Sequence, residues 1–95
     1  MVKIIWTKLA LEDLRSIHEY ISKDSKVYAD RQIKKIIKRV EQIENFPKTG
    51  RIVPELNSEF IRELIEGNYR IIYQIHSDST DIGIVRIHHA ARQLK

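Results

Sequence analysis

The spacing of apolar residues changes once along this 95-residue chain, from a helical period to the alternation typical of strands. In the first half, apolar residues recur at steps of three and four, as they do on the buried face of a helix. They form two stripes: Ala10, Leu14, Ile17 and Ile21, then Ala29, Ile33, Ile36, Val40 and Ile43. The first stripe predicts a helix over about residues 8–22, capped by Thr7. The second predicts a helix that begins at Asp24 or Ser25 and ends by Asn45.

The second half has the composition of a loop followed by strands. Pro47, Gly50 and Pro54 interrupt any helix, and three β-like runs follow: "FIRELI", "YRIIYQIH" and "IGIVRIHH". The turns between them, "EGN" and "SDSTD", are short enough for antiparallel neighbours. With the β-like run "VKIIW" at the start, the order is β-α-α-β-β-β. We therefore expect an α+β fold, in which a two-helix hairpin packs on one face of a mostly antiparallel sheet and leaves the other face open.

Length and composition limit the kind of protein. A chain of 95 residues with 42% hydrophobic and 32% charged residues fits a single domain over residues 1–95. It contains no cysteine, which excludes disulfides and thiolate metal ligands. No apolar run is long enough to cross a membrane, so we expect a cytoplasmic protein without a membrane partner.

The basic residues differ in kind between the two halves. Residues 1–50 hold eleven Lys and Arg against seven Asp and Glu, and residues 51–95 hold six of each class. The net charge of +4 favours an acidic partner such as nucleic acid. Lysine dominates the first half, whereas the second half uses arginine almost exclusively. Arginine binds phosphate or carboxylate with two parallel hydrogen bonds, so the second half is the better candidate for a site.

Strand alternation sorts these cations by face. Because neighbouring side chains of a strand point to opposite faces, Arg62, Arg70, Arg86 and His88 are predicted to converge on the open face. His89 has the opposite phase, which predicts a buried histidine bonded to the backbone. The convergence depends on the register between strands, which alternation alone does not give.

Four segments, in order along the chain, carry a resemblance that spans nearly all of it. They are "W…A…DL..I..YI" near the start, "P..GR.VPE" in the loop, "REL…YRIIY" in the middle strands and "H.AR" at the end. This arrangement resembles the RelE/ParE toxin superfamily. The resemblance implies a small basic toxin of a bacterial type II toxin–antitoxin module, neutralised by an antitoxin whose acidic, partly disordered segment wraps around it.

One branch of that superfamily consists of ribosome-dependent messenger-RNA endonucleases. RNA cleavage needs a base for the 2′-hydroxyl, a cation for the phosphorane charge and an acid for the leaving 5′-oxygen. The resemblance implies Glu55 as general base, Arg70 as phosphate clamp and His88 as general acid. The RNA backbone would be held by four further arginines, with no metal or cofactor: Arg51, Arg62, Arg86 and Arg92.

Two other functions stay open. The ending "HHAARQLK" is similar to the branch that inhibits DNA gyrase by binding, and the chain lacks the lysines and late tyrosine of a second ribonuclease branch. In the gyrase branch, Glu55, Arg70 and His88 would be structural or contact residues. The remaining alternative is a nucleic-acid-binding module without toxic activity, although the strands lack interleaved aromatic residues that stack on bases.

Overall fold

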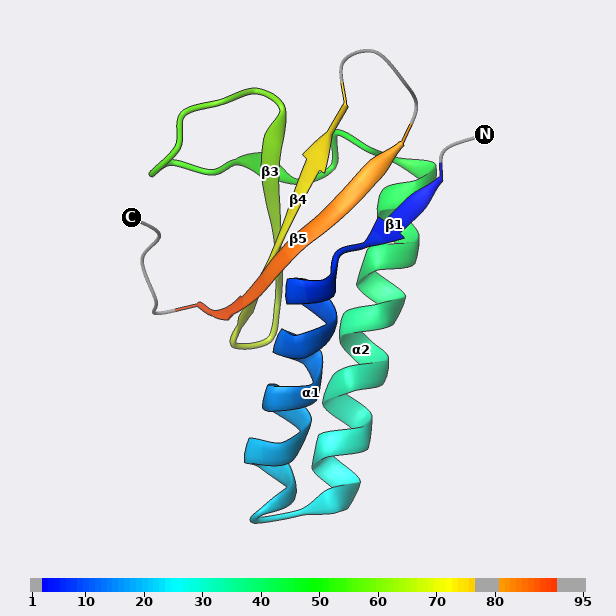
Figure 1. Cartoon of the computed structure of the whole chain (residues 1–95), viewed down its shortest axis with the longest axis vertical. Coiled ribbons are helices and arrows are strands. Elements are labelled where there is room, and N and C mark those ends of the chain that lie inside the picture. Colours follow the sequence, from blue (N-terminus) through cyan, green and yellow to red (C-terminus); the bar gives the residue numbers. More distant parts are fainter. Residues whose placement is uncertain (1–2, 77–80, 91–95) are drawn as a thin grey trace.

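The computed structural model describes residues 3–76 and 81–90 as a five-stranded sheet with a helical hairpin on one face (Figure 1). The elements in chain order are β1 (Ile4–Trp6), α1 (Lys8–Ser22), α2 (Lys26–Asn45), β2 (Arg51–Ile52), β3 (Ile61–Glu66), β4 (Tyr69–Ile75) and β5 (Ile82–His89). The predicted α+β order is confirmed. The structure adds the two-residue strand β2, which lies inside the segment predicted to be a loop.

Both helices begin at hydroxyl caps. The Thr7 hydroxyl accepts the Ala10 N–H at 3.2 Å and donates to the Ile84 carbonyl at 2.8 Å, so it caps α1 and ties the helix to β5. Ser25, one of the two predicted starts, caps α2 by accepting the Tyr28 N–H at 3.2 Å. Of the described helices, neither combines the length and the apolar character that crossing a bilayer would need.

The strand order across the sheet is β1-β5-β4-β3-β2. Strand β1 runs parallel to β5, and the other neighbours are antiparallel. The turn between β3 and β4 places Gly67 at a φ of 58°, a conformation that glycine adopts without strain. Most of the turn predicted between β4 and β5 lies outside the described residues.

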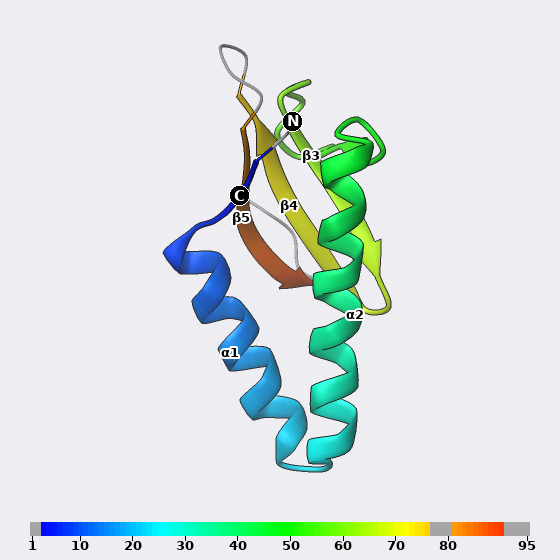
Figure 2. The ribbon, with the colours of Figure 1, turned by 90° about the vertical axis from the view of Figure 1, so that its right-hand side faces the viewer.

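The core fills the space between the hairpin and one face of the sheet. The helices contribute Ala10, Ile36, Val40 and Ile43, and the strands contribute Leu64, Ile71, Tyr73, Ile82, Ile84 and Ile87. Figure 2 shows α1 on the side of β5 and α2 on the side of β3, with the turn of the hairpin projecting beyond the sheet. The helices thus cover one face only, as predicted.

A β-bulge in β5 decides which side chains face the helices. Ile72 pairs with Arg86, but Tyr73 pairs with Ile84, so Val85 is an extra residue on β5. Without the bulge, Ile82 and Ile84 would share a face with Arg86 and His88. The extra residue puts both isoleucines into the core and leaves Arg86 and His88 on the other face.

The sheet face opposite the helices is not fully open. Its residues include Glu63 on β3, Arg70 and Ile72 on β4, and His88 on β5. All four have at most 6% of their surface exposed. The loop that joins β2 to β3, residues 53–60, lies over part of this face and carries Glu55 onto Arg70. We call this side of the sheet the loop face.

Candidate functional site

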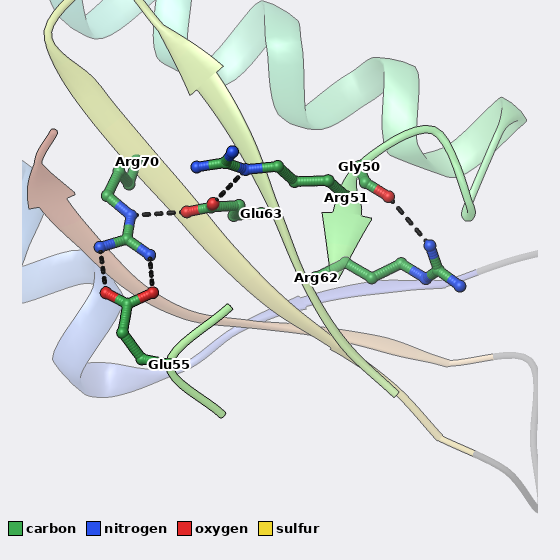
Figure 3. Close-up of polar contacts among 6 residues, drawn as sticks. All are labelled: Gly50, Arg51, Glu55, Arg62, Glu63 and Arg70. Atoms are coloured by element: carbon green, nitrogen blue, oxygen red, sulfur yellow. Dashed lines mark hydrogen bonds and ion pairs between the residues drawn. The ribbon is translucent and has the colours of Figure 1, made fainter. Parts of the chain in front are cut away.

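A buried carboxylate on β3 is at the centre of the loop face. The Glu63 side chain is fully buried, and its two oxygens accept one hydrogen bond each, from Nε of Arg51 and from Nε of Arg70, both at 2.5 Å (Figure 3). Arg51 comes from β2 and Arg70 from β4, the two neighbours of β3. Burial of a carboxylate is costly unless it is paired, and here two guanidinium groups satisfy it.

The outer edge of Arg70 binds a second carboxylate. Its two terminal nitrogens, Nη1 and Nη2, donate to Glu55 Oε2 at 2.8 Å and to Glu55 Oε1 at 3.0 Å. This is the two-bond, fork-to-carboxylate arrangement that arginine also makes with phosphate. The hydrogen bond to Glu55 and the interactions with Glu63 raise the pKa of Arg70, although burial acts against them. Arg70 therefore stays charged with only 5% of its side chain exposed.

The segment that joins α2 to β2 is anchored through a buried tyrosine. The Tyr73 hydroxyl donates to the Pro47 carbonyl at 2.8 Å and accepts the Gly50 N–H at 2.9 Å. A Cβ atom on Gly50 would lie 2.5 Å from the Glu63 carbonyl oxygen and 2.6 Å from the Tyr73 hydroxyl, so only glycine fits there. These contacts fix the chain where it enters β2 and delivers Arg51 to Glu63.

His88 lies on the same side of the sheet as Arg70. The two residues are directly opposite each other in the register of β4 and β5, and directly opposite residues share a face. His88 is 6% exposed. It also lines a cleft of about 530 Å³ whose other lining residues include Asp13, Ser16 and Tyr20 of α1. The predicted base, clamp and acid thus come from a loop and two neighbouring strands onto one face.

Comparisons with known proteins identify the family of this arrangement. Residues 4–94 match the ParE toxin family of type II toxin–antitoxin systems, parDE. The Toxin RelE2 of Caulobacter vibrioides is 32% identical over 92 residues, which cover 97% of this chain and 99% of that protein.

The chain belongs to the RelE/ParE toxin superfamily.

Solved structures of RelE/ParE proteins share the fold. A structure of the chromosomal ParDE system from P. aeruginosa gives a TM-score of 0.77 at 22% identity, over 94% of this chain and 96% of that one. The RelBE2 toxin–antitoxin complex from Mycobacterium tuberculosis gives 0.65 at 20% identity, over 92% and 95% of the two chains. A mutant of E. coli RelE in the free state gives 0.65 at 13% identity, over 94% and 83%.

Two arginines of this RelE/ParE toxin do not join the cluster, contrary to the predicted convergence. Arg62 pairs in register with Tyr73, a core residue, so it lies on the helix side of the sheet and donates from Nη1 to the Gly50 carbonyl at 3.0 Å. Alternation in "FIRELI" correctly puts Arg62 on the strand face opposite Ile61 and Ile65. The prediction was wrong because it assumed that the face with the two isoleucines packs on the helices. The core residue of this strand is instead Leu64, which shares the phase of Arg62.

The second exception is Arg86, which binds helix α1. Its Nε and Nη2 donate to the two oxygens of Asp13 at 2.9 and 3.0 Å, and Asp13 also accepts the Ile87 N–H at 2.9 Å. Strand β1 pairs with β5 only as far as Ile84, so Asp13 occupies the exposed edge beyond it. Burial raises the pKa of Asp13, but these hydrogen bonds outweigh it and hold the pKa below its usual value.

The remaining predicted residues divide as follows. Arg51 is in the cluster, with 65% of its side chain exposed. Arg92 lies outside the described residues. The prediction for His89 is wrong: the residue is exposed, and its ring lies edge-on to Tyr69 with the ring centres 5.8 Å apart.

Sequence reasoning missed two acidic residues of the RelE/ParE site. Neither Glu63 nor Asp13 was among the site residues predicted from the sequence. A signal for Glu63 was present, since a carboxylate stands between Ile61 and Ile65 on one strand face. Asp13 gave no such signal, because its partner is 73 residues away. Within residues 3–76 and 81–90, no three His, Cys, Asp or Glu side chains gather as a metal site.

Proposed function

We propose that this toxin is a ribosome-dependent messenger-RNA endonuclease that acts in the cytoplasm. The observation that carries the proposal is the two-bond contact between Glu55 and Arg70, with His88 directly opposite Arg70 in the sheet. This grouping supplies the three chemical roles that RNA cleavage needs. Membership of a toxin superfamily supports a toxic activity over a binding module without one.

The substrate phosphate takes the place of Glu55 on Arg70. A phosphodiester offers two oxygens to the Nη1 and Nη2 donors that Glu55 binds in the absence of RNA. The displaced carboxylate stays beside the phosphate, where it accepts the proton of the attacking 2′-hydroxyl. Arg70 then stabilises the charge that builds on the phosphorane.

His88 completes the reaction by donating a proton to the leaving 5′-oxygen as the phosphorus–oxygen bond breaks. An imidazole suits this role because its ordinary pKa near 6.5 provides both protonation states at cellular pH. The products are a 2′,3′-cyclic phosphate on one fragment and a 5′-hydroxyl on the other. Arg51 holds the RNA backbone beside the reacting phosphate, and RNA contacts by Arg62, Arg86 and Arg92 stay predictions.

The partner of this toxin is an antitoxin. Solved relatives of the same fold are toxin–antitoxin systems, which supports a cognate antitoxin for this chain. An acidic antitoxin segment has carboxylates that suit the arginines of the loop face, and its binding there would block access of RNA.

Gyrase inhibition is the second candidate. Two observations favour it: the match over residues 4–94 is to a ParE family, and the ParDE structure has a higher TM-score than the two RelE structures described above. In this case the toxin acts by binding, and the Glu55–Arg70 pair holds the loop in place.

One pair of assays separates the candidates. Purified toxin is incubated with ribosomes on a defined message, and separately with DNA gyrase and relaxed plasmid. Cut message with unaffected gyrase is the expected result. Intact message together with trapped gyrase–DNA cleavage complexes would replace the endonuclease with the gyrase inhibitor.

A further inference from the structure

Glu63 binds two arginines, each through the Nε of its guanidinium group. It bonds Nε of Arg51 on one side and Nε of Arg70 on the other, and its side chain has no exposed surface. Arg51 is the direct cross-strand partner of Glu63, and Arg70 pairs with Ile65 two residues further along β3. One carboxylate therefore sets the position of two guanidinium groups on neighbouring strands.

The use of Nε leaves the outer edges of both guanidinium groups for other partners. A guanidinium group has five N–H donors in one plane, one on Nε and four on the two Nη atoms, so a bond through Nε alone leaves the Nη donors for other partners. The Nη edge of Arg70 faces Glu55, and Arg51 has 65% of its side chain exposed. Figure 3 shows Arg70 beside Glu63 with its Nη atoms turned toward Glu55, and the guanidinium group of Arg51 next to the same carboxylate.

The charges make a purely stabilising role a poor explanation. A buried ion pair contributes little net stability compared with apolar residues of similar volume, so burial of Glu63 is not explained by stability alone. Without Glu55 on Arg70, the group keeps two cations against one buried carboxylate. Glu63 thus reduces the positive charge of the surface while it fixes the direction of the donors.

From this arrangement we propose that Glu63 is a positioning residue, which aims the outer edges of Arg51 and Arg70 at two adjacent phosphates of one nucleic-acid strand. This inference deepens the proposed endonuclease, since one phosphate would be the reacting one and the other its neighbour. The recognition itself depends on the phosphates and not on cleavage. Binding of nucleic acid can therefore be measured under conditions in which no cleavage occurs.

The distinguishing variant is Glu63→Gln. Simple electrostatics predicts tighter binding of a polyanion, because the variant has one negative charge fewer. The positioning role predicts the opposite, since the glutamine offers an N–H group to one guanidinium and no longer holds both. The matched control is Glu66→Gln, which removes a carboxylate from the same strand whose contact with Arg39 is long, at 3.9 Å.

The experiment measures binding of a short single-stranded RNA, and of DNA of the same sequence, at several salt concentrations. The slope of log affinity against log salt falls by about 0.7 for each phosphate of a single strand that the protein no longer neutralises. We expect Glu63→Gln to bind both strands more weakly than the parent, with a slope reduced by about 0.7 to 1.4. Glu66→Gln should keep the slope of the parent. An equal decrease on RNA and DNA assigns the binding to phosphates.

Three results would overturn the inference: no binding of either strand by the parent, tighter binding by folded Glu63→Gln, or an unchanged slope. If Glu63→Gln does not fold, Glu63→Asp keeps the charge and withdraws the carboxylate by one methylene, and the same decrease in slope is expected. A parent that binds with the expected slope yet leaves ribosomal message intact supports the positioning role and contradicts the endonuclease.

Discussion

Arg70 and His88 face each other across β4 and β5 on the loop face, and the bulge at Val85 turns Ile82 and Ile84 of the same strand toward the core. The bulge changes the phase of β5 between Ile84 and Arg86, so the strand contributes isoleucines to the core at one end and His88 to the site at the other. The same pair of strands thus stabilises the fold and positions a proposed acid beside a proposed clamp.

Arg70 is the residue whose removal should affect both activity and folding. Arg70→Ala should lower cleavage about a hundredfold or more by removing charge stabilisation. It also leaves Glu63 buried with a single partner, which should cost about 3 kcal/mol in the free energy of unfolding. Rates on ribosomes and denaturant unfolding measure the two effects. Arg70→Lys serves as control, since lysine keeps the positive charge but cannot donate two parallel hydrogen bonds to a phosphate. Near-parental cleavage by this variant would contradict the proposed role of Arg70 as phosphate clamp.

The neighbouring histidines should behave differently. His88→Ala removes the proposed acid, and we expect cleavage to fall about 10²- to 10⁴-fold. His89 is exposed beside Tyr69, so His89→Ala should leave cleavage intact and lower stability by about 1 kcal/mol, the size of an aromatic contact. Comparable cleavage by both variants would show that His88 is not the acid.

Asp13 should make part of the stability depend on pH. Its pKa is lowered in the folded protein, so its contribution is present above the ordinary value of 3.8 and is lost as the pH falls through the folded-state pKa. Asp13→Asn should remove this dependence and lower stability at neutral pH by about 2 kcal/mol. Unfolding measured from neutral to acidic pH tests this. Parallel curves for parent and variant would mean that Asp13 is not the group responsible.

Tyr73 should stabilise the segment between α2 and β2 through its hydroxyl. Tyr73→Phe removes the donor to Pro47 and the acceptor for Gly50, which should cost about 1–3 kcal/mol because both backbone groups lose a partner. Tyr20→Phe is the matched control, since Tyr20 is 71% exposed. Urea unfolding compares the two variants, and equal stability would indicate that the segment between α2 and β2 is held by other contacts.

The fold followed from the sequence because its signals are local. Two apolar stripes at helical spacing, the hydroxyl caps and the Pro–Gly loop are each contained in short segments. The α+β order and the covered face are therefore confirmed by the structure. The strand β2 escaped prediction because its two residues pair with Glu63 and Arg62, and no period can be read from so short a segment.

The site was only partly predictable because register and long-range pairing decide it. Alternation cannot show which phase of a strand meets the helices, and this put Arg62 on the wrong face. Alternation also cannot show the β-bulge at Val85, which puts Ile84 and His88 on opposite faces of the sheet. Arg86 lies on the predicted face of β5, but its contact with Asp13 could not be predicted because Asp13 is on a helix 73 residues away in the chain.

The products of cleavage test the central claim most directly. Ribosomes carrying a defined message are treated with the parent and with His88→Ala, and the ends of any fragments are determined. We expect fragments with 2′,3′-cyclic phosphate and 5′-hydroxyl ends from the parent, far fewer from His88→Ala, and none at a position whose 2′-hydroxyl is replaced by hydrogen. Cleavage that persists at the 2′-deoxy position, or a message that stays intact with the parent, would contradict the central claim.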